Sequence, residues 1–247
     1  MGLDVLVFGP HPDDIEIGLG GTVARHAALG SRVGLCDLTV GELASNGTPE
    51  ERLAEGERAR QILGAAWREN LRLPDGRLGE VVEQVQAVAA LIRREQPRVI
   101  AIPHDRDRHP DHADAHRLLT RAIFAAGLRR YDAPGEAWRP EWVCEYFIND
   151  AAPPSFVVDV SACYEVKRQA LACHTSQFTP PDGVATRLTS SRFRQLIESR
   201  DAQFGALAGV AFAEGLVVRE PIVRPDLFKT SAESSQAAGR NGDWKPW

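Results

Sequence analysis

Strand-like and helix-like segments alternate through the first half of this chain, and this alternation constrains the fold most strongly. Short apolar runs rich in β-branched residues predict strands at 3–9, 32–39, 70–73 and 98–103. The helices predicted after these strands cover residues 18–29, 49–63, 79–95 and 111–126. A βαβα order predicts one mostly parallel sheet with helices on both faces, which is a Rossmann-like α/β fold.

The second half of the chain has a more mixed pattern. It predicts strands at 142–148, 156–160 and 209–218 and helices at 161–173 and 190–207. Because no linker separates the two halves, we expect a single domain over residues 1–230. Residues 231–247 are rich in Ser, Ala, Gly, Gln and Asn without an apolar period, which predicts a flexible tail.

Composition excludes several function classes. Hydrophobic residues make up 43% and charged residues 26% of the 247 residues, as in ordinary globular enzymes. A net charge of −5 argues against nucleic acid as a partner. No apolar run approaches the roughly 20 residues that span a bilayer, so no membrane association is expected. Four cysteines without CxxC spacing, and a start without a signal-peptide pattern, predict a reduced, cytoplasmic protein.

A His-Pro-Asp-Asp motif follows the first predicted strand. It contains His11, Asp13 and Asp14, and imidazole nitrogen and carboxylate oxygen are both good ligands for zinc and related ions. Functional residues of open α/β sheets gather at the carboxyl ends of the strands, which is where this motif lies. We therefore expect the active site at this edge of the sheet.

A second motif, His109-Pro110-Asp111-His112, follows the strand at 98–103 and opens onto the same sheet edge. A catalytic zinc site has three protein ligands and one open position. His11, Asp14 and one of the two later histidines supply that number. Asp13 then remains as general base for a metal-activated water, and the other histidine, as imidazolium, would stabilise an oxyanion or protonate a leaving amine.

Both the ligand set and the class of function still have alternatives at this point. His116 lies one turn after His112 and is an alternative ligand, although it is expected deeper along the helix, and His104 is expected to support the ligands from behind. The run Gly18-Leu19-Gly20-Gly21 superficially resembles a dinucleotide fingerprint, but Val23 occupies the position of its third glycine. A nucleotide- or carbohydrate-binding module is therefore the alternative to an enzyme.

The sequence resembles the PIG-L/LmbE-type metal-dependent N-deacetylases over about residues 3–228. Within that family it is most similar to the bacillithiol-pathway deacetylases, which remove acetate from N-acetylglucosaminyl malate. The segments that match the family are His11 to Glu16, Gly18 to Thr22 and His109 to His112. The segments that support the similarity to the bacillithiol-pathway branch are Cys36 to Thr39, Ser45 to Thr48, Asp107-Arg108, Ser176 to Phe178 and Ala213 to Gly215.

The resemblance implies a role for each motif residue. His11, Asp14 and His112 match the zinc ligands, and Asp13 matches the general base. His109 matches the histidine that stabilises the charged transition state. The reaction implied is hydrolysis of the acetamide of N-acetylglucosaminyl L-malate to acetate and glucosaminyl malate. Another N-acetylglucosamine-containing sugar or thiol conjugate is the alternative substrate.

Three further residues belong to this expectation. Arg52 matches an arginine associated with substrate and oxyanion binding, whereas the residue pattern alone favours an exposed charge in i,i+4 pairs. Asp111 is expected to orient a ligand histidine from behind. We expect Arg108 to bind the malate carboxylates, because a guanidinium binds carboxylate bidentately. The resemblance also implies a homo-oligomer, for which a hexamer is one arrangement.

Overall fold

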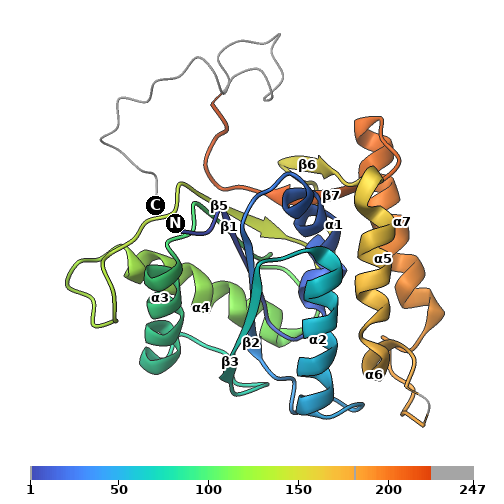
Figure 1. Cartoon of the computed structure of the whole chain (residues 1–247), viewed down its shortest axis with the longest axis horizontal. Helices are drawn as coiled ribbons and strands as arrows, with labels where there is room; N and C mark the ends of the chain where they lie inside the picture. The colour runs from blue at the N-terminus through green and yellow to red at the C-terminus, as the bar shows by residue number, and fades with distance from the viewer. Residues whose placement is uncertain (1, 181, 224–247) are drawn as a thin grey trace.

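A computed structural model describes residues 2–180 and 182–223 of the chain and shows one seven-stranded sheet covered by helices (Figure 1). The strands are β1 (Val5–Gly9), β2 (Val33–Thr39), β3 (Trp67–Leu73), β4 (Val99–Pro103), β5 (Trp142–Tyr146), β6 (Phe156–Asp159) and β7 (Ala213–Val217). The helices are α1 (Asp14–Ala28), α2 (Pro49–Leu63), α3 (Val82–Glu95), α4 (Pro110–Ala126), α5 (Tyr164–Ala172), α6 (Thr175–Phe178) and α7 (Ser191–Ala208). The tail predicted at 231–247 lies outside the described residues.

The strand order is β3-β2-β1-β4-β5-β7-β6. The first five strands pair in parallel, and β7 is antiparallel to both of its neighbours, so the prediction of a mostly parallel α/β sheet is confirmed. From β1 the chain proceeds outward through β2 and β3, whereas β4 and β5 extend the sheet in the other direction. The carboxyl ends of β1 and β4 therefore flank the point at which the strand order reverses, where open α/β sheets place their ligands.

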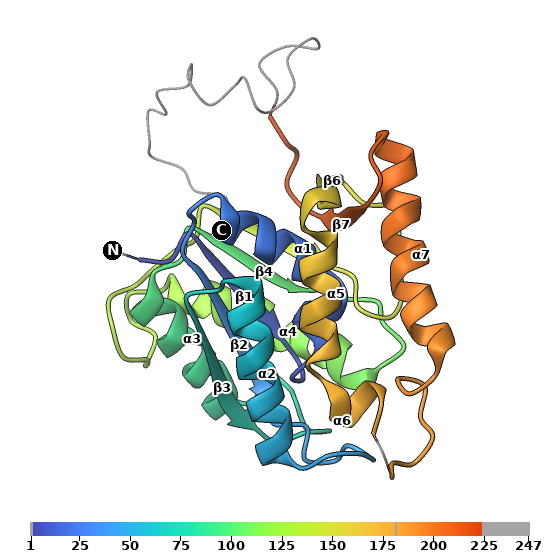
Figure 2. The same cartoon turned by 45° about the vertical axis from the view of Figure 1, so that its right-hand side comes forward.

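Alternating side chains of the strands build a core on each face of the sheet. In β1, Leu6 and Phe8 join a cluster with side chains from α3 and α4, while Val7 faces the opposite cluster with side chains from α1 and α2. Figures 1 and 2 show α3 and α4 on one side of the sheet and α1, α2 and α5 on the other. The strands are buried on both faces, which fixes the strand ends in place.

The first helix begins earlier than the sequence predicts. It starts at Asp14 rather than at residue 18, because the His-Pro-Asp-Asp motif contains the turn into the helix, with Asp13 as N-cap. The glycine run consequently lies inside α1. A Cβ atom on Gly18 would stand 2.4 Å from the Tyr146 ring and 2.6 Å from the Phe147 carbonyl oxygen. These glycines allow close helix–sheet packing, and none forms the strand-to-helix turn that a dinucleotide fingerprint needs.

Other boundaries shift by a few residues. The helix predicted at 161–173 begins with a 3-10 turn over Ser161–Cys163 and is α-helical only from Tyr164, and the final strand is confined to Ala213–Val217.

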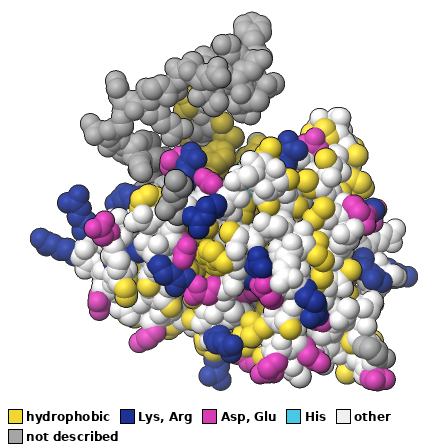
Figure 3. Space-filling model, in the orientation of Figure 1, with side chains coloured by type: hydrophobic (Ala, Val, Ile, Leu, Met, Phe, Trp, Pro, Cys, Tyr) yellow, Lys and Arg dark blue, Asp and Glu magenta, His cyan; other side chains and the backbone are white. Residues whose placement is uncertain are grey.

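Among the described residues, no helix is long and apolar enough to cross a membrane. On the face shown in Figure 3, basic and acidic side chains are interspersed, and no broad basic patch covers it.

We expect Gly18→Ala to destabilise the fold by about 1–3 kcal/mol, because the added methyl group overlaps the Tyr146 ring and a backbone carbonyl. Urea unfolding followed by circular dichroism measures this change. Gly79→Ala is the matched control, because no atom lies within 4 Å of the Cβ position there. Equal stability of both variants would contradict the packing role of Gly18.

Candidate active site and metal centre

The two histidine motifs meet at the carboxyl ends of β1 and β4. His11, Asp13 and Asp14 form the turn between β1 and α1, whereas His109 and His112 begin α4 after β4. Because β1 and β4 are hydrogen-bonded neighbours, these two turns face each other across the reversal of strand order. The sheet topology therefore brings together residues that lie about a hundred positions apart in the sequence.

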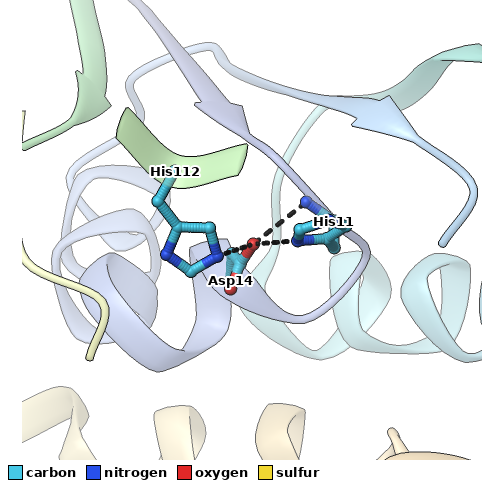
Figure 4. Close-up of side chains that lie close together, drawn as sticks. All are labelled: His11, Asp14 and His112. Carbon is cyan, nitrogen blue, oxygen red and sulfur yellow. Dashed lines mark hydrogen bonds and ion pairs between the residues drawn. The ribbon is translucent and has the colours of Figure 1, made fainter. Parts of the chain in front are cut away.

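Asp14 stands between the two imidazole rings (Figure 4). Its Oδ2 atom lies 3.1 Å from Nδ1 of His11 and 3.3 Å from Nε2 of His112, and it also accepts the backbone N–H of His11 at 3.0 Å. The donor atoms of these three buried residues lie within 4.8 Å of one another. Two imidazole nitrogens and one carboxylate oxygen suit a divalent transition metal such as zinc and leave a position for water or substrate. The residues present therefore fit a catalytic metal.

In both histidines, the ring nitrogen that does not face Asp14 lies next to a second carboxylate. Nδ1 of His112 lies 3.1 Å from Oδ1 of Asp107, and Nε2 of His11 lies 3.1 Å from Oδ1 of Asp75 and 3.4 Å from Oδ2 of Asp111. Carboxylates in this position fix the orientation and tautomer of a metal-binding imidazole. Asp111 therefore lies near His11, but Asp75 is closer to His11, and Asp107 is the carboxylate next to His112.

The electrostatics of this cluster favour a cation. Burial opposes protonation of His112, but Asp14 and Asp107 outweigh it and raise its pKa to about 9. Burial likewise opposes ionisation of Asp14, yet the two histidines hold its pKa well below the ordinary range. The carboxylates therefore carry negative charge at neutral pH, and positive charge is bound tightly among them. A divalent cation would replace the protons of the imidazoles.

Asp13 differs from its neighbours in conformation and in hydrogen bonding. Its backbone has φ of 133° and ψ of −25°, a strained combination for a residue other than glycine that costs about 1–3 kcal/mol. Its Oδ2 atom is buried and finds no hydrogen-bond partner among residues 2–180 and 182–223. Burial raises the pKa of Asp13 to about 6, although Arg52 opposes the shift. A carboxylate with one free oxygen and such a pKa suits a general base.

Arg52 lies inside the site, so the alternative of an exposed helix charge is wrong. Only 4% of its surface is exposed. Its Nη2 atom lies 3.4 Å from Oδ1 of Asp13 and donates to the Pro12 carbonyl at 3.0 Å, while Nη1 donates to the Gly41 carbonyl at 3.3 Å. Gly41 has φ of 68°, and a Cβ there would collide with the guanidinium. The helix start at Pro49 and the glycine turn together place Arg52 against Asp13.

His109 is the N-cap of α4, and its Nδ1 atom accepts the backbone N–H of Asp111 at 3.3 Å. We infer from this bond that the neutral ring carries its proton on Nε2. Burial, followed by the neighbouring His11 and His112, lowers the pKa of His109 below its usual value. The imidazolium expected for this residue stays a prediction. A neutral His109 still offers an N–H donor to an oxygen that becomes negative.

These residues line a cavity of about 550 Å³. Arg108 is exposed and lines the same cavity, as do Asn149, Gln177 and the segment 186–188. Asn149, after β5, donates to Asp107 at 3.0 Å and so supports the carboxylate behind His112. The cavity thus has the histidines and carboxylates on its floor and loop residues around its rim.

His116 and His104 do not join this group. Nδ1 of His116 donates to the Pro103 carbonyl at 2.9 Å, and Nη2 of Arg219 lies 2.7 Å from its Nε2, so both ring nitrogens are occupied. His104 lies 3.4 Å from Asp105 and 3.9 Å from Glu145 and packs against the Phe147 ring. Neither histidine lies among the carboxylates that hold His11 and His112.

Sequence reasoning missed Asp75 and Asn149 and gave Asp107 no role. A signal existed for each of them, because Asp75 follows β3 in a Pro-Asp-Gly turn, and Asp107 and Asn149 follow β4 and β5. Polar residues at the ends of parallel strands are site candidates by position alone.

Comparison with known proteins gives concordant matches. The family profile described as "PIG-L: GlcNAc-PI de-N-acetylase" matches residues 6–123, which include both histidine motifs. A "Diacetylchitobiose deacetylase" from Thermococcus kodakarensis is 29% identical over 224 residues, which cover 86% of this chain and 81% of the relative. A "1D-myo-inositol 2-acetamido-2-deoxy-alpha-D-glucopyranoside deacetylase" from Rhodococcus erythropolis is 32% identical over 251 aligned positions, covering 76% of this chain and 85% of the relative.

Solved structures share the fold. The conserved protein TT1542 from Thermus thermophilus superposes with a TM-score of 0.84 at 40% identity, covering 92% of this chain and all of that one. A 4-carboxy-2-hydroxymuconate hydratase from Pseudomonas putida superposes with a TM-score of 0.76 at 21% identity, covering 90% of this chain and 98% of that one. The second likeness concerns the fold alone, so the reaction has to be argued from the site.

We expect Asp107→Asn to weaken binding of a divalent metal about 10–100-fold, because His112 loses the charged partner that orients it. Competition with a chromogenic zinc chelator measures this affinity. Asp114→Asn is the control, because its carboxylate pairs with Arg117 and belongs to none of the described groups that could hold a metal ion. Unchanged affinity in Asp107→Asn would separate Asp107 from metal binding.

Proposed function

Because this chain belongs to the PIG-L family, we propose that it is a metal-dependent hydrolase that removes the acetyl group from an N-acetylglucosaminyl conjugate. The observation that carries the proposal is the free Oδ2 atom of Asp13 beside the His11–Asp14–His112 cluster. A buried carboxylate oxygen without a partner is costly, and its natural partner in a hydrolase is the attacking water. Asp14 would hold the metal, and the neighbouring carboxylate of Asp13 would remain for the reaction.

A divalent cation at the cluster would polarise the acetamide carbonyl and lower the pKa of water at the site from 15.7 towards about 7. Asp13 accepts one proton as the water oxygen bonds to the carbonyl carbon. The C–N bond then breaks, the proton is delivered to the departing nitrogen, and acetate and a free amine leave. Every atom of the water appears in the products, and no redox step is needed.

His109 and Arg52 have separate roles in this reaction: His109 stabilises the negative charge on the carbonyl oxygen, and Arg52 orients the general base. Nε2–H of His109 can donate to the carbonyl oxygen as it becomes negative, which strengthens a hydrogen bond in the transition state more than in the ground state. Arg52 holds Asp13 through Oδ1 and leaves Oδ2 for water. Arg52 therefore orients the base, and its buried charge also favours the ionised carboxylate.

The substrate in this proposal is N-acetylglucosaminyl L-malate, and the products are acetate and glucosaminyl malate, as in bacillithiol biosynthesis. Two observations support this substrate. The sequence resembles the bacillithiol-pathway deacetylases in segments outside the two histidine motifs, and the exposed Arg108 lines the cavity. The alternative is another N-acetylglucosamine-containing compound, since the named relatives act on diacetylchitobiose and on an inositol glycoside. Zinc is the proposed metal on the basis of its nitrogen and oxygen ligands. The homo-oligomer remains a prediction.

We expect zinc-loaded protein to release acetate from N-acetylglucosaminyl malate with a higher kcat/KM than from diacetylchitobiose or N-acetylglucosamine. Mass spectrometry of the deacetylated amine, with the three substrates offered separately, measures this preference. Metal removal by a chelator should abolish turnover, and re-addition of zinc should restore it. Absence of product from all three substrates in a zinc-loaded sample would exclude the proposed reaction.

We expect Asp13→Asn to lower kcat by a factor on the order of a hundred or more, because no carboxylate then accepts the proton of water. Zinc content, measured by inductively coupled plasma mass spectrometry, should stay near that of the unsubstituted protein, since Asp13 is outside the ligand set. A variant that retained nearly full kcat would show that another group is the base.

A further inference from the structure

The cavity rim carries two guanidinium groups from separate loops. Arg108 follows β4, and Arg187 belongs to the segment between α6 and α7. Both are exposed, and both line the cavity whose floor holds Asp13 and the histidines. The sequence predicts Arg108 as a substrate contact and predicts no role for Arg187.

The other charged groups of the cavity already have partners. Asp14 faces two histidines, Asp75 faces His11, and Arg52 faces Asp13. By contrast, among residues 2–180 and 182–223, no carboxylate lies within ion-pair distance of Arg108 or Arg187. Two cations without counter-charges at the opening of a catalytic cavity favour a ligand that brings negative charge.

Arg187 is held towards the cavity by its own segment. Its guanidinium carbon lies 5.4 Å from the centre of the Phe193 ring, which also lines the cavity. On either side of it, Thr186 and Thr189 exchange hydrogen bonds: the Thr189 hydroxyl accepts the Thr186 N–H at 2.9 Å, and the Thr186 hydroxyl accepts the Thr189 N–H at 3.3 Å. Arg187 thus lies in a turn that is closed by its own hydrogen bonds, and its guanidinium lies next to the Phe193 ring.

The same segment is fastened to the catalytic side of the molecule. The Asn46 side chain donates to the Val184 carbonyl at 2.9 Å and accepts the Val184 N–H at 2.8 Å. Asn46 is held in turn, because Gln177 donates to its carbonyl oxygen at 2.7 Å. A segment fixed in this way loses little conformational entropy when its arginine binds a ligand.

We propose that Arg187, together with Arg108, binds an anionic group on the aglycone of the amino sugar and so selects acidic conjugates over neutral ones. This inference rests on the proposed deacetylase function and adds a second, unassigned specificity residue to it. A guanidinium presents paired N–H donors that match a carboxylate or a phosphate. Arginines from two loops can contact an aglycone with two acidic groups, as in malate, from two directions.

The test compares Arg187→Gln with Arg192→Gln, which removes the same charge from an exposed position outside the cavity. Steady-state kinetics are measured with N-acetylglucosaminyl malate, N-acetylglucosamine 1-phosphate and the neutral methyl glycoside of N-acetylglucosamine. The first two substrates separate carboxylate from phosphate as the anion recognised. Arg187→Lys, which keeps the charge but loses the paired donors, is the conservative variant.

In Arg187→Gln we expect the kcat/KM ratio of the preferred anionic substrate to the neutral one to fall about tenfold, mainly through KM, as for one lost charge-assisted hydrogen bond at a partly exposed site. Arg187→Lys should recover part of this loss, and Arg192→Gln should keep the original ratio. An unchanged ratio in Arg187→Gln, or an equal fall in Arg192→Gln, would overturn the proposal.

A binding measurement separates failure of this inference from failure of the proposed function. Calorimetry with N-acetylglucosaminyl malate and zinc-loaded Asp13→Asn protein gives Kd without turnover. We expect the added Arg187→Gln change to raise Kd about tenfold. If the unsubstituted protein shows no turnover but Kd still rises in this way, the reaction is wrong and the anion site stands. If turnover occurs and Kd is unaffected, the anion site is wrong and the reaction stands.

Discussion

The contact on which the site depends is the carboxylate of Asp14 between two imidazoles from different parts of the chain. Its Oδ2 atom accepts the His11 backbone N–H and also faces the rings of His11 and His112. One oxygen therefore ties the turn after β1 to the helix after β4. Each ring also has a carboxylate on its second nitrogen, and a neutral imidazole has only one N–H, so the arrangement favours an added proton or a metal ion at the cluster.

That contact also explains the strain at Asp13. The chain must turn from β1 into α1 within a few residues while Asp14 becomes the first residue of the helix. Asp13 absorbs the change of direction in a backbone conformation that is unfavourable for a residue with a side chain. The result is a carboxylate with one oxygen held by Arg52 and one oxygen free. Strain, burial and the raised pKa of Asp13 thus have a common origin in the geometry of the turn.

The sequence was sufficient to predict the mostly parallel sheet, the edge that carries the site and the PIG-L family. It also named the residues that the fold brings together, because the His-Pro-Asp motifs are local and follow recognisable strands. Asp75 and Asn149 lie far from those motifs in the sequence, and only the order of the strands places them behind His11 and His112. The start of α1 differs from the sequence prediction because the helix already begins within the His-Pro-Asp-Asp motif, at Asp14. The pKa of His109 depends on His11 and Asp14 from the other motif as well as on His112 and Asp111, and no local pattern reveals the first two.

Fold alone would not have given the chemistry, since a hydratase shares this architecture. The floor of the cavity is built on the ends of buried strands, whereas the rim segment with Arg187 is attached through the Asn46 side chain and the packing of Leu188 against the core. Residues 182–190 contain no strand and no residue of the metal-binding cluster, so their replacement would change the rim and keep His11, Asp14, His112 and Asp13. Substitutions in this rim segment can therefore change which aglycone is recognised, while the residues that cleave the amide stay the same. Related proteins with the same catalytic residues can in this way act in different biosynthetic pathways.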